Sequence, residues 1–205
     1  MTRVVAYVDG FNLYYGLKAG YGRKYHWLDL QLLARSLLRP GQELRAVHYF
    51  TARAYGDSAG EGRQATYLDA LANHSAKVRL VEGRFQEKPQ GCLSCGARWI
   101  TYEEKETDVN IAVSLVADSA AAASDIALIV SADSDLCPAI RTTRALNPTR
   151  GLIAAFPPRR SSFEIRSLVR ATFTIAAVDL RNSLLPSTVT DRETGKQHRR
   201  PGKWR

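Results

Sequence analysis

Cysteine, methionine and long apolar runs are scarce in this chain. It has three cysteines and one methionine among 205 residues. That is too few thiols for a disulfide framework, and reduced thiols are typical of an intracellular protein. No stretch reaches the roughly 18 to 20 consecutive apolar residues of a membrane-spanning helix, and the N-terminus lacks a long apolar signal region. These absences lead us to expect a cytoplasmic protein with no membrane partner.

Two common nucleotide-binding motifs and one phosphatase motif are also absent. The sequence contains no GxxxxGK[ST] loop, and Gly20-Tyr21-Gly22 lacks the third glycine and the preceding strand of a dinucleotide fingerprint. Hydrolases of the haloacid dehalogenase type need a second Asp two positions after the first, where this chain has Phe11. A phosphatase-type hydrolase is therefore a less favoured function.

Positive charge is in excess. The chain has 29 Lys+Arg against 20 Asp+Glu, a formal net charge of +9. A field of this sign attracts polyanions such as nucleic acid or an anionic membrane surface, and charge alone does not choose between them.

The length and the 45% of hydrophobic residues are enough for one continuous core. We expect one domain over residues 1–180, followed by a basic C-terminal tail over residues 181–205. From Pro186 onward the tail is polar and basic, and this stretch is either a flexible arm or a segment pinned to the domain, with Trp204 as its only large apolar anchor.

Strand and helix patterns alternate along the chain. Short runs rich in β-branched residues predict buried strands, and periodic apolar residues between them predict helices. The expected strands cover residues 3–8, 44–52, 77–85, 125–130, 151–156 and 172–175, and residues 86–102 are expected to form a polar loop. Since parallel neighbours need crossover connections, this pattern predicts a Rossmann-like, three-layer αβα domain of the α/β class with a mostly parallel sheet.

Three acids directly follow expected strands. Asp9 ends the first strand, and Asp133 and Asp135 follow the strand over residues 125–130. Ligands of open α/β sheets bind beyond the carboxyl ends of the strands. Clustered carboxylates need a compensating charge, and oxygen-only ligation suits Mg²⁺ or Mn²⁺. Because such a cation can activate water and neutralise a phosphoryl oxygen, we predict phosphodiester hydrolysis, although turn and N-cap roles are the alternative for each acid alone.

Three segments resemble a known family. VVAYVDGFNLYYGLK, EEKETDVNIAVSLVAD and DIALIVSADSDLCPAI are similar in order and spacing to the signature blocks of NYN domains, a branch of the PIN-like nucleases, over about residues 3–180. RPGKW in the tail is similar to the ends of bacterial NYN domain-containing proteins. The resemblance implies a PIN-like fold and a Mg²⁺- or Mn²⁺-dependent ribonuclease that acts on RNA. The chain departs from the family at Ala132, where many members have Gly, and at Ser114, where an Asp is common.

The resemblance also implies which residues form the site. The acids that match the catalytic and metal-binding set of the family are Asp9, Asp108, Asp133 and Asp135. Asn12 of the DGFN turn is expected near the metal or substrate, with Ser131 and Ser134 lining the same loop. Asp108 depends on the family match, because acids are favoured in a first helical turn without any function.

Aromatic and basic residues gather after Asp9. The rings are Tyr14, Tyr15, Tyr21, Tyr25 and Trp27, and the cations are Lys18, Arg23 and Lys24. Exposed rings could stack on bases while Lys18 and its neighbours hold phosphates. Packing of the rings in the core is the alternative. A non-catalytic RNA-binding or scaffold module with the same fold is the remaining alternative for the whole chain.

A CLSC motif suggests a second metal site. Cys92 and Cys95 are spaced to bind one tetrahedral zinc ion, but they form only half of a structural site. Cys137, a histidine or the second subunit of a homodimer could complete it. Two reduced loop thiols are the alternative.

Overall fold

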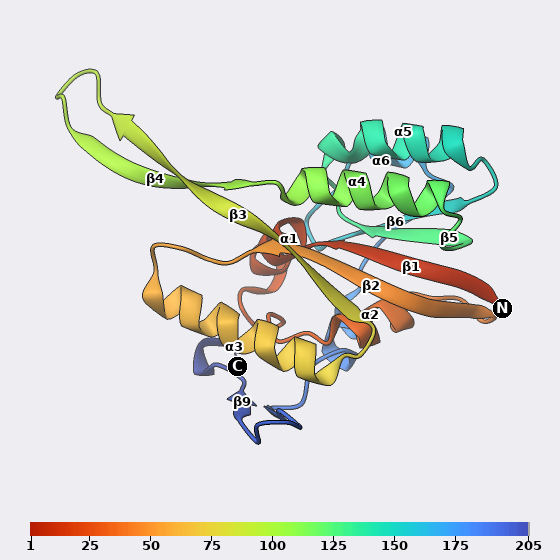
Figure 1. Cartoon of the computed structure of the whole chain (residues 1–205), viewed down its shortest axis with the longest axis horizontal. Helices are drawn as coiled ribbons and strands as arrows, with labels where there is room; N and C mark the ends of the chain where they lie inside the picture. Colours follow the sequence, from red (N-terminus) through yellow and green to blue (C-terminus); the bar gives the residue numbers. More distant parts are fainter. Residues whose placement is uncertain (205) are drawn as a thin grey trace.

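A seven-stranded sheet forms the middle layer of the protein in the computed structural model, which describes residues 1–204 (Figure 1). The strand order is β4-β3-β2-β1-β5-β6-β7. The strands are β1 (Thr2–Asp9), β2 (Gln42–Ala52), β3 (Val78–Gly91), β4 (Arg98–Lys105), β5 (Ile126–Val130), β6 (Gly151–Phe156) and β7 (Ala171–Thr174). Every neighbouring pair is parallel except β3 and β4. The mostly parallel sheet predicted from the sequence is confirmed.

Helices cover both faces of the sheet. One face carries α1 (Gly10–Tyr21), α2 (Leu30–Ser36), α3 (Ser58–His74) and α7 (Ala177–Asn182), and the other carries α4 (Thr107–Ala120), α5 (Cys137–Leu146) and α6 (Phe163–Leu168). Successive side chains of a strand point to opposite faces, so Val4 and Ala6 of β1 join the first core while Val5 and Tyr7 join the second. The predicted three-layer architecture is therefore confirmed. Among residues 1–204, no helix has the length and apolar character needed to cross a membrane.

A long β-hairpin replaces the loop expected over residues 86–102. β3 continues to Gly91 and pairs with β4 in antiparallel register, from Arg84 opposite Lys105 to Gly91 opposite Arg98. The hairpin projects from the body of the domain (Figure 1). Its outer part is exposed on both faces, so its sequence lacks the alternation of apolar and polar residues that marks a half-buried strand. The loop expectation was therefore wrong.

The C-terminal segment packs against the domain. It contains β8 (Thr188–Thr190), β9 (Gln197–Arg199) and the short 3-10 helix η2 (Gly202–Trp204). Trp204 is only 7% exposed, and its ring centroid lies 6.3 Å from that of Trp27 and 6.1 Å from that of Tyr67. Of the two alternatives for the tail, the structure has the pinned segment. The division of the chain at residue 180 stays a prediction.

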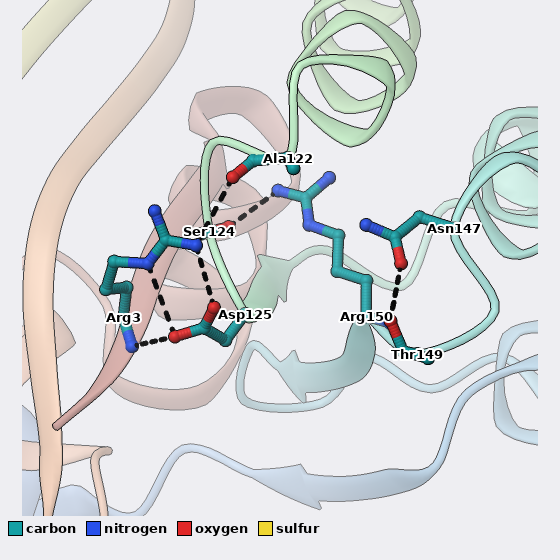
Figure 2. A network of polar contacts seen from close by, with 7 residues as sticks. All are labelled: Arg3, Ala122, Ser124, Asp125, Asn147, Thr149 and Arg150. Atoms are coloured by element: carbon teal, nitrogen blue, oxygen red, sulfur yellow. Dashed lines mark hydrogen bonds and ion pairs between the residues drawn. The ribbon is translucent and has the colours of Figure 1, made fainter.

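Charged side chains are matched at the amino ends of β1 and β5 (Figure 2). The Arg3 guanidinium forms an ion pair with Asp125 at 2.8 Å. Arg150 is buried, and its Nη2 donates to the hydroxyl oxygens of Tyr7 and Ser124, both at 2.8 Å. These contacts tie the start of the sheet to the loops that enter β5 and β6.

Candidate metal centre

Asp9 lies where β1 passes into α1. Its side chain is 3% exposed and caps the helix by accepting a hydrogen bond from the Asn12 backbone N–H at 2.9 Å. The other carboxylate oxygen accepts from the Ser131 hydroxyl at 2.8 Å. A Cβ on Gly10 would lie 2.5 Å from the Phe50 carbonyl oxygen, so only glycine lets the helix begin this close to β2. The orientation of Asp9 is thus fixed by α1 on one side and by the loop after β5 on the other.

The loop after β5 holds Asp133. Its backbone N–H donates to the Ser131 hydroxyl at 3.0 Å, and its side chain accepts from the Asp135 N–H at 3.0 Å. The Asn12 side-chain oxygen accepts from the Ala132 N–H at 3.1 Å and joins this loop to α1. Asp9 and Asp133 therefore do serve as caps. A carboxylate has several acceptor positions, so capping does not prevent them from binding a cation.

Asp108 reaches the same place from the opposite face of the sheet. It lies in the first turn of α4, directly after Thr107. Glu104 caps this helix by accepting from the backbone N–H of Thr107 at 2.9 Å and from its hydroxyl. Sequence reasoning gave Glu104 no role and missed this contact.

Three of the four expected acids converge. Asp9, Asp108 and Asp133 each offer a carboxylate oxygen, and these oxygens all lie within 4.8 Å of one another. Oxygens that share an octahedral Mg²⁺ with bonds of about 2.0 to 2.1 Å are up to about 4 Å apart. Small side-chain rotations therefore suffice for shared coordination. Within residues 1–204, none of the three forms an ion pair with Lys, Arg or His.

The electrostatics of the trio reflect this lack of cations. The pKa of Asp108 is raised to about 6, first by burial and then by the charges of Asp9, Asp133, Glu104 and Asp135. Burial also raises the pKa of Asp9, although its hydrogen bonds oppose the rise. A divalent cation would relieve this repulsion, so the centre favours binding of such an ion.

Asp135 and Ser134 lie at the exposed edge of the centre. Both belong to the short 3-10 helix η1 (Ser134–Leu136), and Asp135 is not among the three converging acids. Ser131 is fully buried and bonds to Asp9, which makes it a support of the acid. The metal-binding and substrate-binding roles of these residues stay predictions.

A cavity of about 440 Å³ adjoins the centre on the α1 and α3 face of the sheet. Gly10 and Phe11, directly after Asp9, form part of its wall. Lys18 of α1 lines this cavity, so it lies beside the acids rather than among them. His26 and Trp204 also line it, and sequence reasoning assigned neither of them to this cavity, having named His26 only among the histidines that could complete a zinc site.

The two cysteines of the CLSC motif lie at the tip of the β3–β4 hairpin. Cys92 donates its N–H to the Ala97 carbonyl at 2.8 Å and accepts from the Gly96 N–H at 2.9 Å, which closes a tight turn. Hydrogen bonds from the backbone and side chain of Cys95 lower the pKa of the Cys92 thiol. Over residues 1–204, no group of three or more His, Cys, Asp or Glu side chains able to hold a metal includes this pair. A zinc ion there stays a prediction.

Comparisons with known proteins agree with the fold. The NYN domain family model matches residues 3–175. The 6-hydroxy-3-succinoylpyridine 3-monooxygenase HspA of Pseudomonas putida (strain DSM 28022 / S16) is 32% identical, over 73% of this chain and 57% of that protein. The chain thus spans little more than half the length of this curated relative. A protein of unknown function from Vibrio parahaemolyticus RIMD 2210633 has a crystal structure with a TM-score of 0.61 and 16% identity, covering 90% of this chain and 96% of that one, which shows the shared fold.

Proposed function

Because the chain belongs to the NYN domain family, we propose that it is a metal-dependent ribonuclease that hydrolyses phosphodiester bonds of RNA. One observation carries the proposal: Asp9, Asp108 and Asp133 bring carboxylate oxygens within 4.8 Å of one another. They come from three separate elements and have no cation to neutralise them within the described residues. Repulsion between these carboxylates destabilises the folded protein, and binding of a divalent cation would offset it.

The ligand set fits Mg²⁺ or Mn²⁺, because it consists of carboxylate oxygens alone. A cation bound there supplies Lewis acidity toward a phosphoryl oxygen and lowers the pKa of a bound water. Asp9 is the rigid member, since Asn12 and Ser131 fix its oxygens. Burial and the neighbouring acids raise the pKa of Asp108 to about 6, and a cation held by the trio would favour its ionised form. Asp135 is proposed as an outer acid that acts on approaching ligands by its charge.

The substrate side of the proposal rests on charge and exposure. The net charge of +9 attracts RNA. Exposed Lys18, which lines the cavity that begins at Gly10, and exposed Ser134, directly after Asp133, are the proposed substrate contacts, while Asn12 positions the loop after β5. The same proposal places the protein in the cytoplasm. A homodimer that shares zinc between two copies of the Cys92 and Cys95 pair remains part of it.

A second candidate function follows from the name of the monooxygenase relative, which describes a substituted pyridine as substrate. The cavity of about 440 Å³ beside Asp9 suits a small planar ring, because aromatic side chains line much of it. Only 57% of the relative is covered, so this candidate concerns binding of such a ring by the shared part. Binding of a hydroxypyridine that is unaffected by chelator, in the absence of any RNA cleavage, would favour it.

The decisive experiment is a cleavage assay with purified protein. Unstructured RNA, structured RNA and single-stranded DNA are each incubated with Mn²⁺, Mg²⁺ or chelator, and the product ends are mapped. We expect RNA cleavage only with metal. Asp133→Asn should abolish it and leave RNA affinity within about threefold, because the basic surface still binds phosphates. Asp125→Asn, which removes an acid at the other edge of the sheet, is the matched control and should retain cleavage. Chelator-resistant cleavage, or full activity of Asp133→Asn, would exclude this centre.

A further inference from the structure

The cavity beside the acids has an aromatic wall. It holds about 440 Å³ and begins at Gly10 and Phe11, the residues that follow Asp9. The wall is made by four segments far apart in the sequence, namely the α1 region, the end of β2 with α3, β3 and the C-terminal η2. Its rings include Tyr14, Tyr25, Tyr49, Tyr67, Phe85 and Trp204. A planar heteroaromatic ring would find stacking partners there.

Cations stand at the same cavity. Lys18, Arg23 and Arg63 line it together with one acid, Asp57. Asp57 lies 3.6 Å from Arg63 and compensates that charge. Lys18 and Arg23 are exposed and form no ion pair within the described part of the chain. The unpaired charge at the cavity is therefore positive and suits a ligand that carries an anionic group beside its ring.

A buried histidine adds hydrogen-bonding capacity. His26 is 6% exposed and lies between Tyr14 and Trp204, with ring centroids 4.6 Å and 5.6 Å away. Neither of its ring nitrogens has a hydrogen-bond partner among residues 1–204. Burial, followed by the charges of Arg23 and Lys18, lowers the pKa of His26 to about 4, so the ring is neutral and offers one donor and one acceptor. Both nitrogens are buried, and Tyr14, which is 38% exposed, stacks on the His26 ring, so the proposal below requires the Tyr14 side chain to turn aside.

We propose that this cavity binds one unstacked base of single-stranded RNA, which stacks on Tyr14, pairs its edge with His26 and places its flanking phosphates at Lys18 and Arg23. The cavity adjoins Asp9, so this base would lie next to the phosphodiester bond that is cleaved, and this part of the proposal rests on the proposed ribonuclease function. In a duplex the bases are stacked and paired, so a base must be unstacked and unpaired before it can enter the cavity, which costs free energy. The site therefore makes the protein selective for single strands.

The test measures binding separately from cleavage. Asp133→Asn protein, which leaves the RNA intact, is titrated with a short single-stranded RNA that carries 2-aminopurine at one position in turn. We expect a fluorescence change at one position. Tyr14→Ala should weaken binding by about five- to hundredfold, the range for loss of one stacked base, and Tyr14→Phe by less than about twofold. Phe163→Ala removes an aromatic ring that is 81% exposed on α6 and should have no effect.

A second variant separates recognition from packing. His26→Phe keeps a ring between Tyr14 and Trp204 and removes the two unpartnered nitrogens. It should weaken binding of the single strand by about tenfold, the usual order for one lost hydrogen bond to a neutral partner. Its melting temperature should be unchanged or higher, because no buried polar atom is left unpaired. If His26→Phe and Tyr14→Ala, each made in the Asp133→Asn protein, both bind the single strand as tightly as that parent protein, the proposal is overturned.

Competing ligands show whether the cavity takes a base of RNA or a free heteroaromatic acid. A hairpin RNA of the same composition should bind at least about tenfold more weakly, and a nucleoside monophosphate should compete. If nicotinate binds in a Tyr14-dependent manner and RNA does not, the ligand is a free heteroaromatic acid and the RNA proposal is overturned. If the fluorescence change depends on Tyr14 while Mn²⁺ produces no cleavage by the unsubstituted protein, the ribonuclease proposal fails and the base site stands.

Discussion

The amino ends of β1 and β5 carry an ion pair, whereas the carboxyl ends of the same strands carry clustered acids. At the amino ends, Arg3 pairs with Asp125, and its hydrogen bonds hold the pKa of that carboxyl below its usual value. At the carboxyl ends, Asp9 and Asp133 face Asp108, none of the three is ion-paired to a cation of residues 1–204, and the pKa of Asp108 rises to about 6. The charges at the amino-end edge of the sheet, where Arg3 and Asp125 lie, are thus balanced within the chain. The other end carries acids that no ion pair balances within residues 1–204, and these acids could hold a divalent cation.

The buried Arg150 strengthens this contrast. Its guanidinium donates to the Leu115 carbonyl, the Ser124 hydroxyl and the Tyr7 hydroxyl, and Tyr7 in turn donates to Asp118 at 2.5 Å. A buried charge with these partners supports the fold. The unpaired acids at the other edge act against the fold, which is the pattern expected of a functional site.

The largest effect is expected from Asp9→Asn. It should lower metal-dependent RNA cleavage by about a thousandfold or more, since loss of a ligand removes several kcal/mol of transition-state stabilisation. Thermal stability should not fall, because the Asn oxygen still accepts from the Asn12 N–H, its amide N–H can donate to the Ser131 hydroxyl oxygen, and a buried negative charge is removed. Initial rates with Mn²⁺ and a melting curve check both parts. A variant that cleaves at the original rate would remove Asp9 from the centre.

Arg150→Met tests the balanced edge. It should lower the free energy of unfolding by about 3 kcal/mol, because the Tyr7 and Ser124 hydroxyls and the Leu115 carbonyl lose their buried partner. Urea denaturation measures the loss. The metal affinity of the folded variant should equal that of the unsubstituted protein. Unchanged stability would show that this network does not support the fold.

Asp108→Asn gives a smaller, pH-dependent effect. An acid whose folded pKa is raised from 3.8 to about 6 binds its proton more tightly in the folded state, so its ionised form destabilises. The penalty is absent below about pH 4 and complete above about pH 6. Metal-free Asp108→Asn should be more stable at pH 7.5 by about 1 kcal/mol, after allowance for the solvent that screens this half-buried group, or about 2 to 4 °C in melting temperature.

The control for Asp108→Asn is the same comparison at pH 3.5, where the difference should disappear. Addition of Mg²⁺ at pH 7.5 should reverse its sign, since the cation stabilises only the protein with the complete set of acids. If Asp108→Asn is less stable than the unsubstituted protein at pH 7.5 without metal, the claim that ionised Asp108 destabilises the fold is wrong.

Arg3→Ala should have the smallest effect. The Arg3 and Asp125 side chains are each 43% exposed, and exposed ion pairs contribute little. The pKa of Asp125 is lowered, so the contribution of the pair is present at neutral pH and is lost as the pH falls through the lowered value. Melting curves at low salt and at about 1 M salt should converge, because salt screens surface charges. A difference that persists in high salt would mean that Arg3 acts by packing.

Sequence reasoning predicted the framework of the centre. The strand patterns fixed the places of Asp9 and Asp133 at the carboxyl ends of β1 and β5, which are neighbours in the sheet. The family resemblance was needed for Asp108, because an acid in a first helical turn is common without any function. Asp135, which looked equivalent to Asp133, lies at the exposed edge outside the converging trio.

The hairpin and the cavity escaped prediction for a different reason. The exposed pairing of β3 with β4 leaves no apolar alternation to detect. The contact of His26 with Trp204 joins residues 178 positions apart along the numbering of the chain. Local patterns carry no signal for such long-range contacts.

The sequence by itself determined the alternation of strands and helices, the parallel sheet and the edge at which the acids gather, because periodicity and strand ends are local properties. Only the tertiary structure decided which acids bring their carboxylate oxygens together and which acid is ion-paired, as Asp125 is with Arg3. It also decided that the C-terminal Trp204 lines a cavity beside Asp9. Each of these depends on distances between side chains from separate elements, and packing of the whole core sets those distances.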